Sequence, residues 1–598
     1  MSAAPPAIHV SQVGWTCSSR KRIVVAAEAA GSAAEFVIQD LGRIDAQALG
    51  AAESWAAAFR GRLAAHRGPM GAYLVGDFSA LARPGVYRAM LASAGARPAW
   101  SFPFVISDAA WSRLPALFLD YVHMQRCGEF ENDARGPCHL DDGIRSDTGA
   151  AVDAAGGWHD GGDVRKWMAT TPLPILGFFE MRNRLGFSRN HWRERPHEDD
   201  LLAEAAWGLR WMLKMQDPAT GMFFEDVGGG GDSRREAGMS WWYENHAGCL
   251  ADNSGNRFTD NRPGTGDERT VRVQYNPVAQ YVAVCILMDA ADHFHPHYPA
   301  FSQLCRQAAV RCWDFMKARR KDEFHGWTSV VAWRLLAALR LHTVGASAES
   351  ELAALVSVML DQQSPAGYWY MDRGREEPYR GILSSAQPVI ALAGFLESDY
   401  EHPLAAAVRA ALDRCRAQFI MPMLETNPFG MMPYGLFSRP RSEADVYHPW
   451  KEAPGENALV YRFFMPTGAP EKVNHGLASH WTSWAHALAL LGQILADDAC
   501  RDAAFDQLAW LTGCNPLNAC MIAGVGCRTA SPYSRFYGTI PGGFSVGPRG
   551  TAEDEAAVDL EGRTEWISGE YWMVPLANAS MALAALLPSR VLASKKLG

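Results

Sequence analysis

From about residue 113 onward, apolar residues recur with the spacing of an α-helix. Apolar positions at i, i+3 and i+4 repeat in successive segments, a pattern typical of helices that bury one face. These segments are 113–126, 173–185, 199–216, 275–294, 301–319, 327–343, 349–362, 383–397, 403–418, 474–496, 500–512 and 571–588. About twelve helices joined by long loops favour a toroid of helix pairs, in which the loops gather at one end and form a cleft. Residues 108–598 are therefore expected to form one mainly α domain.

The first hundred residues follow a different pattern. Short runs rich in β-branched and aromatic residues alternate with turn residues such as Gly14, Gly42 and Pro84-Gly85. The runs are 8–13, 22–26, 35–40, 73–78, 86–91 and 101–106. This spacing predicts a small antiparallel β-sandwich over residues 1–107, followed by a hinge over 107–115.

Composition narrows the class of protein. The net charge is -9 and the basic residues are scattered, which argues against a nucleic-acid partner. No run of about 18 apolar residues predicts a membrane span. Twelve cysteines in 598 residues are too few for a disulfide scaffold, and the N-terminus shows no signal-peptide pattern. A cytoplasmic protein is expected, and a secreted or periplasmic protein whose leader was removed is the alternative.

The densest chemical signal is the segment 156–163, which reads Gly-Gly-Trp-His-Asp-Gly-Gly-Asp. Asp160 and Asp163 are separated by two glycines, whose flexible backbone allows both carboxylates to point into the same small space. One carboxylate can activate a water molecule while the other holds it in place. By residue type alone, a turn and a cation site remain alternatives.

Several separate blocks of the chain, in the right order, resemble glycoside hydrolase family 9, the family of cellulases. The blocks are 8–15, 84–87, 101–104, 125–128, 137–139, 156–163, 510–517 and 540–548. The resemblance implies an (α/α)6-barrel catalytic domain preceded by an immunoglobulin-like domain.

The resemblance also implies a mechanism that inverts the anomeric carbon. Asp163 is then the general base and Asp160 orients the attacking water. The family's acid is a Glu shortly before the final helix, which makes Glu570 the best match. Glu570 precedes Asn578 by eight residues where the family pattern has six, so Glu565 remains the alternative acid. Inverting enzymes need one ionised carboxylate and one protonated acid, about 6.5–9.5 Å apart.

Two cysteines and two histidines form a candidate metal site. Cys127, Cys138, His139 and His159 supply the ligand types of a tetrahedral Cys2His2 zinc site. Their spacing is not that of a zinc finger, and the resemblance is what implies a structural zinc here. Zinc bound by His159 would anchor the loop that carries Asp160 and Asp163. The oxygen-rich segment 252–256 lacks the pattern of a calcium loop and is interpreted as a polar turn.

The chain contains 21 tryptophans, more than an ordinary core requires. Trp offers a flat apolar face and one hydrogen-bond donor, the indole N–H, which suits stacking on a sugar ring. Arg535 and Tyr533 occupy the place where many family members carry a His-His-Arg cluster that grips the sugar. The complete set of candidate sugar contacts is Trp158, Trp241, Trp242, Trp450, Tyr533, Arg535, Tyr571 and Trp572.

These observations predict an inverting β-glycosidase that acts on soluble β-1,4-linked oligosaccharides. Exo-type removal of a glucose- or glucosamine-like unit is expected. One alternative is a secreted endo-β-1,4-glucanase. An α/α-toroid polysaccharide lyase or epimerase is an alternative of another class, and a sugar-binding protein without activity is a third. The sequence leaves the oligomeric state open.

Overall fold

The computed structural model describes most of the chain. The described residues are 8–30, 34–42, 56–91, 98–130, 136–162, 164–192, 199–228, 258–319, 326–381, 383–398, 401–439, 448–465, 476–532, 539–562 and 566–588. No helix among these residues has both the length and the apolar character needed to cross a membrane.

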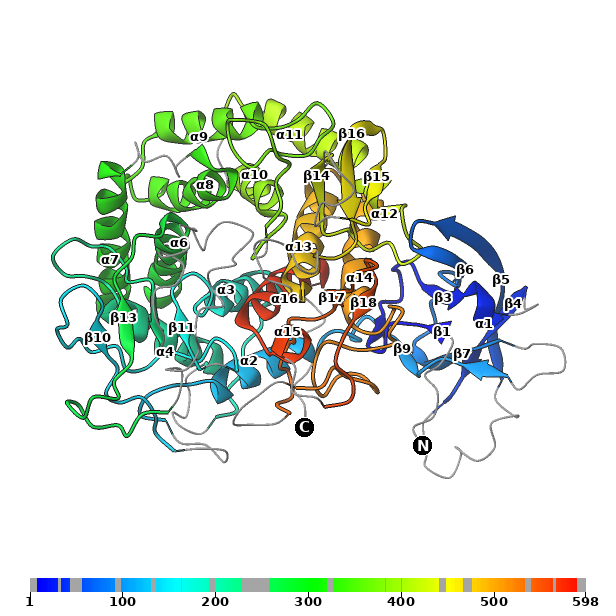
Figure 1. Cartoon of the computed structure of the whole chain (residues 1–598), viewed down its shortest axis with the longest axis horizontal. Helices are drawn as coiled ribbons and strands as arrows, with labels where there is room; N and C mark the ends of the chain where they lie inside the picture. The colour runs from blue at the N-terminus through cyan, green and yellow to red at the C-terminus, as the bar shows by residue number, and fades with distance from the viewer. Residues whose placement is uncertain are drawn as a thin grey trace.

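Six helices form a closed inner ring (Figure 1). In chain order they are α3 (Pro174–Leu185), α6 (Pro277–Phe294), α8 (Thr328–His342), α10 (Gln387–Glu397), α13 (Ala478–Ile494) and α16 (Met573–Leu586). Each packs against the next, and α16 packs against α3, so that the last helix closes the ring on the first.

Six further helices pack outside this ring and alternate with the inner helices along the chain. They are α2 (Leu114–Met124), α4 (Asp200–Lys214), α7 (Pro299–Ala318), α9 (Glu349–Asp361), α11 (Ala405–Arg414) and α14 (Asp498–Leu511). A π-helical segment (Cys415–Ile420) and the short α12 (Met421–Leu424) extend α11. The twelve predicted helical segments are therefore confirmed, and together they form a double-layered α/α barrel.

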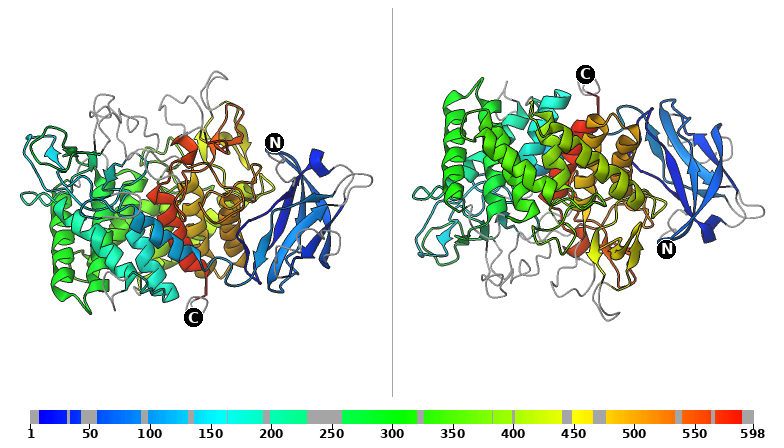
Figure 2. Two further views of the ribbon diagram at one scale, coloured as in Figure 1. Left: turned by 90° about the horizontal axis from the view of Figure 1, so that it is seen from below. Right: turned by 90° about the horizontal axis from the view of Figure 1, so that it is seen from above.

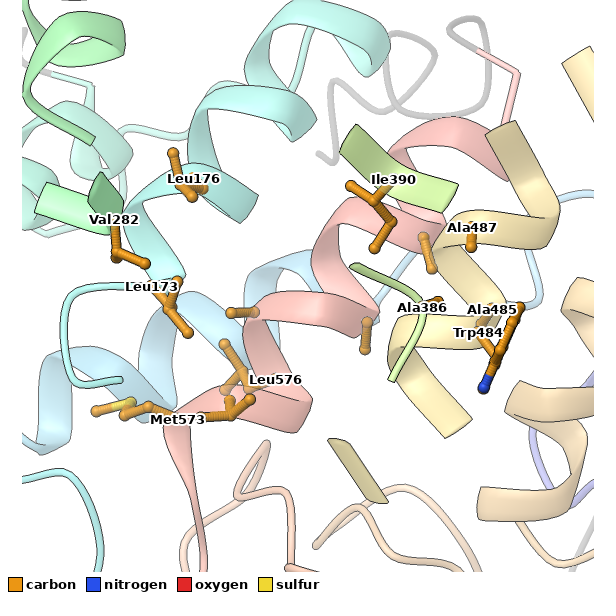
Figure 3. Packing of buried hydrophobic residues seen from close by; sticks show 14 of the residues in the cluster. Leu173, Leu176, Val282, Ala386, Ile390, Trp484, Ala485, Ala487, Met573 and Leu576 are labelled. Atoms are coloured by element: carbon orange, nitrogen blue, oxygen red, sulfur yellow. The ribbon is translucent and has the colours of Figure 1, made fainter. Parts of the chain in front are cut away.

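The inner helices pack closely because small and apolar residues occupy their facing sides. Gly177 of α3 lies against Ser580 of α16, and a Cβ atom at position 177 would lie 2.6 Å from the Ser580 Cβ. Leu176 of α3, Val282 of α6 and Ile390 of α10 are among the buried residues drawn in Figure 3. Buried side chains from different inner helices therefore form one continuous apolar core.

The described parts of the long connections lie at one end of the barrel. They run from the end of an outer helix to the start of the next inner helix, as 125–173 does between α2 and α3 and 512–572 does between α14 and α16. The return connections from inner to outer helices are shorter. The expectation that the loops gather at one end is thus confirmed.

These long loops contain three small sheets and a short helix. Strands β10 (Ile144–Arg145), β13 (Thr270–Arg272), β12 (Asp226–Gly228) and β11 (Lys166–Trp167) form a four-stranded sheet in that order. The other sheets are β14 (Gly435–Ser438), β16 (Glu456–Arg462) and β15 (Lys451–Ala453), and the pair β17 (Arg549–Gly550) with β18 (Ala556–Ala557). The short helix α15 (Trp566–Gly569) precedes α16. The four-stranded sheet ties the loop after α2 to the loop after α4.

The N-terminal part of the chain is a nine-stranded β structure with its own buried core. Its strands are β1 (Ile8–His9), β2 (Gly14–Trp15), β3 (Arg22–Ala26), β4 (Glu35–Asp40), β5 (Ala57–Gly68), β6 (Gly71–Asp77), β7 (Gly85–Leu91), β8 (Ala99–Trp100) and β9 (Phe104–Ile106). A short helix, α1 (Ala27–Ala30), follows β3. The strand order is β1-β3-β6-β5-β4-β7-β9-β2, and β8 pairs with β7.

Two features of this β structure differ from the prediction. Strand β5 was not predicted, because Ala, Gly and Arg fill most of it and β-branched residues are lacking. Strand β2 pairs with β9 in parallel, so the prediction of an all-antiparallel arrangement is wrong at that pair.

The β structure lies against the outer helix α14 (Figure 2). Arg20 and Arg22 both pair with Asp506 of α14, whose side chain is 6% exposed. The Gln12 side chain donates a hydrogen bond to the Asn518 carbonyl (2.9 Å). Ion pairs to a buried carboxylate and a buried hydrogen bond therefore fix the β structure to the barrel.

Candidate active site

The carboxylate of Asp160 is held on both of its oxygens. Thr170 and Thr171 donate hydroxyl hydrogen bonds to its Oδ1 at 2.7 and 3.0 Å. The indole Nε1 of Trp572 donates to its Oδ2 at 2.8 Å. Asp160 is itself buried. Thr170 and Thr171 lie just before α3, and Trp572 lies directly before α16. The packing of α16 against α3, which closes the inner ring, therefore sets the orientation of this carboxylate.

Glu570 lies against the same loop, although it is 408 residues away from Gly162 in the chain. The backbone N–H of Gly162 donates to Glu570 Oε1 at 3.0 Å. A Cβ atom at Gly161 would lie 2.8 Å from that same oxygen, so a larger residue there would displace the Glu570 carboxylate. The structure thus brings Glu570 to the segment that joins Asp160 to Asp163. Asp163 itself and the alternative acid Glu565 lie outside the described residues.

A buried charge network lies behind this loop. Asp142 accepts two hydrogen bonds from the Arg269 guanidinium (2.9 and 2.6 Å) and pairs with Lys166 Nζ at 2.7 Å. Burial opposes the charge of Asp142, but Arg269 and Lys166 outweigh it and lower the pKa of this carboxyl. Arg269 also donates to the carbonyl of Val164 (2.6 Å), a residue in the left-handed conformation with φ of 57°. The network therefore fixes the backbone directly after position 163.

The candidate metal ligands Cys127, Cys138, His139 and His159 meet in one buried cluster. All four ligand atoms lie within 4.8 Å of one another. Cys127 Sγ is 3.6 Å from His139 Nδ1, and Cys138 Sγ is 3.8 Å from His159 Nε2. The two histidine nitrogens are 3.4 Å apart. The prediction that these residues come together is confirmed.

The cluster has the dimensions and the charge that a tetrahedral metal ion requires. Metal–sulfur and metal–nitrogen bonds of about 2.3 and 2.0 Å place tetrahedral ligand atoms about 3.3–3.8 Å apart, which matches the three distances. Burial opposes ionisation of the Cys127 thiol, but the Cys138 contact and the Lys166 charge outweigh it, so the Cys127 pKa lies well below its usual value. Among the described residues the cysteines are free, so no disulfide competes for these thiols.

Two of the predicted sugar contacts are corrected by the structure. Trp158 has no exposed surface, and its indole donates to Glu204 Oε1 at 2.6 Å. It packs under α4, where a Cβ atom at Gly208 would collide with its ring. Tyr571 is 4% exposed, and burial raises its pKa to about 12. Neither side chain offers a face to a sugar, because both fill the packing beneath the loops.

The remaining predicted sugar contacts divide into two groups. Trp450 and Trp572 are half-buried and keep part of their surface in solvent. Trp572 has a role that sequence reasoning missed, since its N–H holds Asp160. Trp241, Trp242, Tyr533 and Arg535 lie outside the described residues, as does the polar turn predicted at 252–256.

Comparison with known proteins agrees with this architecture. Residues 114–358 match the family model of glycosyl hydrolase family 9. The chain is 29% identical over 241 residues to a xyloglucan-specific endo-β-1,4-glucanase from Bacteroides ovatus. That match spans 36% of this chain and 37% of the relative.

Solved structures with the same fold cover almost the whole chain. A single mutant of a thermostable endoglucanase from Alicyclobacillus acidocaldarius aligns with a TM-score of 0.65 at 20% identity, covering 98% of this chain and all (100%) of that one. A zinc-binding triple mutant of the family 9 endoglucanase J30 aligns with a TM-score of 0.67 at 19% identity, covering 96% and 100%.

The double ring of helices, with Asp160 and Glu570 in the loops at one end, has the same fold as these solved endoglucanase structures. The match to the family model over residues 114–358, the curated relative and the solved structures together support glycosyl hydrolase family 9 as the family that this chain resembles.

Proposed function

We propose that the protein is an endo-acting hydrolase of β-1,4-linked glucans. The observation that carries the proposal is the placement of Glu570 against the loop of Asp160 and Asp163, across more than 400 residues of sequence. The names of the relatives, which include a xyloglucan-specific endo-β-1,4-glucanase and endoglucanases, support endo action over the exo action expected from the sequence. The match of residues 114–358 to a family of glycosyl hydrolases also favours hydrolysis over the lyase and epimerase alternatives.

In the proposed reaction, one water molecule displaces the leaving sugar in a single step. Asp163 removes a proton from the water, while Asp160 accepts a hydrogen bond from it and keeps it in line. Glu570 gives its proton to the departing glycosidic oxygen. At the end of the step Asp163 is protonated and Glu570 is ionised. Direct attack by water inverts the anomeric carbon. The three donors on Asp160 support this role, because a carboxylate with a fixed orientation can position a water.

We infer that the Cys2His2 cluster holds zinc as a structural ion. The pair of thiols and pair of imidazoles, their tetrahedral spacing and their burial support zinc over hard cations. The bound ion would tie Cys127 and Cys138 to His159, the residue directly before Asp160. It would thereby stiffen the loop without taking part in the reaction. We also propose that the N-terminal β structure, over residues 1–107, is an immunoglobulin-like domain.

The test is hydrolysis of soluble polymers and oligomers by the full chain. We expect release of reducing ends from xyloglucan or carboxymethylcellulose with a rapid loss of viscosity, and initial products of inverted configuration by NMR. Glu570→Gln should lower kcat by about 10²–10⁴-fold. Glu553→Gln, at an exposed glutamate in another part of the same long loop, should leave kcat unchanged.

Three results would contradict the proposal. Loss of only terminal units with no early fall in viscosity would overturn endo action. Products of retained configuration would overturn the single displacement. Full activity in Glu570→Gln would remove that residue as the acid and transfer the role to Glu565.

A further inference from the structure

A groove lies on the outer wall of the barrel, between the outer helices α4 and α7, which run side by side (Figure 1). Its volume is about 540 Å³, within the range of pockets that bind small molecules. Its walls come from α4, from the turn between α6 and α7, and from the segments that follow α2 and α3. Thr170, Thr171 and Trp572, which hold Asp160, are not among the described residues that line it, so the groove is separate from the candidate active site.

One wall of the groove is an aromatic platform at the start of α7. Tyr298 is 39% exposed, and Phe301, three residues further along the chain, is half-buried. Both rings pack against the buried Phe294, with ring centroids 6.1 and 5.1 Å from its own. Trp207 of α4 adds another half-buried ring to the lining. Rings that are held from behind offer a flat apolar surface and lose little further side-chain freedom on binding.

Charged side chains that line the groove are matched by neighbours of opposite sign. The pairs are Arg126 with Glu204 (2.9 Å), Arg182 with Asp199 (3.4 Å) and Arg189 with Asp200 (2.9 Å). Arg210 of α4 is exposed and adds one positive charge. A ligand of high charge of either sign therefore gains little here. An uncharged ligand with hydroxyl groups gains more, because guanidinium and carboxylate groups can bind hydroxyls while they keep their partners.

We propose that this groove is a second saccharide site, which binds a neutral β-linked glucan chain; the identity of the sugar rests on the proposed function. A β-linked glucose unit presents an apolar ring face and a rim of hydroxyl groups. The ring face matches the aromatic wall, and the hydroxyl groups match the pair of Arg182 and Asp199. The lining residues of α4 run from Asp199 to Arg210, about 16 Å along the helix, so the groove is long enough for more than one sugar unit.

A second site changes how the protein acts on polymers, but not how it acts on short oligomers. A chain held in the groove stays near the active site, so the local concentration of polymer there rises. The KM for a polymer is therefore lowered, while kcat is unchanged because the groove contacts no reacting atom. An oligomer too short to reach from the groove to the active site gains nothing.

The experiment is electrophoresis of the full chain through native gels that contain neutral xyloglucan, since retardation of the protein by the polymer gives the Kd. The parent and all variants carry Glu570→Gln, which keeps the polymer intact. Tyr298→Ala with Arg210→Ala should raise the Kd about 3- to 10-fold. The control, Leu304→Ala with Lys317→Ala, removes an exposed apolar and an exposed basic side chain from α7 outside the groove, and it should be retarded as the parent is.

Kinetics with Glu570 intact complete the test. The double variant at Tyr298 and Arg210 should raise KM for xyloglucan several-fold with kcat unchanged, and both constants for cellotetraose should stay as in the parent. Arg210→Ala alone, at an exposed position, should also weaken retardation, and it replaces the double variant if that variant fails to fold.

Two results would overturn the inference. Equal retardation of the parent, the double variant and Arg210→Ala, or no retardation of the parent, would remove the site. Stronger retardation by polygalacturonate than by xyloglucan would exclude a neutral chain as the ligand. A parent that xyloglucan retards through the groove but that hydrolyses no glucan would refute the proposed function and leave the site in place.

Discussion

The indole of Trp572 offers a direct test of how the candidate active site is held. Its N–H donates to Asp160 Oδ2 at 2.8 Å, while the two threonine hydroxyls hold Oδ1. Trp572→Phe keeps an aromatic ring and removes only one of these three donors. A hydrogen bond to a charged group is worth about 1.5–3 kcal/mol. Since two donors remain, we expect the lower part of that range, about 1.5–2 kcal/mol, which corresponds to a loss of about 10- to 30-fold in kcat.

The assay is initial-rate hydrolysis over a range of substrate concentrations, because it separates kcat from KM. A donor that orients the water-binding carboxylate acts in the transition state, so kcat should fall while KM changes little. Thr170→Val, which removes a donor from the other oxygen, should give a loss of similar size. Trp100→Phe, in the N-terminal β structure, controls for the loss of an indole. If Trp572→Phe raises KM several-fold and changes kcat by less than about twofold, the indole binds sugar and does not act by orienting Asp160.

Three further predictions concern stability. Asp142→Asn removes the negative charge that pairs with buried Lys166 and Arg269, so the free energy of unfolding should fall by about 3–5 kcal/mol in urea denaturation. An unchanged urea midpoint would contradict this. Removal of metal with a zinc chelator should lower the Tm of the parent, but not that of Cys127→Ser, whereas Cys527→Ser, at an exposed thiol, should respond as the parent does. Burial lowers the pKa of His480 from 6.5 to about 4, so the unfolded chain binds the proton more readily and stability falls as the pH drops from 6.5 towards 4. At pH 4.5 this amounts to about 2–3 kcal/mol, and urea denaturation of His480→Gln should show a weaker dependence on pH over that range.

The helices were the most predictable part of the molecule. Each is long enough for its apolar spacing to repeat over several turns, as in α8, predicted at 327–343 and found at Thr328–His342. Strand β5 was missed because its pairing with β4 and β6, and not its own residue types, makes it a strand. The parallel pairing of β2 with β9 joins the two ends of the β structure, and local pattern carries no information about it.

The site was predictable in its residue types but less so in its geometry. The motif of Asp160 was the densest chemical signal in the sequence, whereas the ligand set of Cys127 and His159 was recognised through the family resemblance, because its spacing matches no zinc-finger pattern. The direction of a side chain cannot be predicted from its residue type. Trp158, which follows two glycines in the chain, points into the core beneath α4. The pairing of Asp142 with Lys166 and Arg269 was also missed, because the three residues span more than 120 positions and match no motif.

The closed ring has a consequence for how the enzyme is made. Glu570 and Trp572 come from the last helical repeat, yet they meet Asp160 and Gly162, which precede the first inner helix. During synthesis the early half of this site leaves the ribosome roughly four hundred residues before its partners. No N-terminal fragment that ends before α16 can therefore assemble the site. Catalytic activity then reports whether the two ends of the barrel have joined, and two separately expressed halves should become active only on mixing.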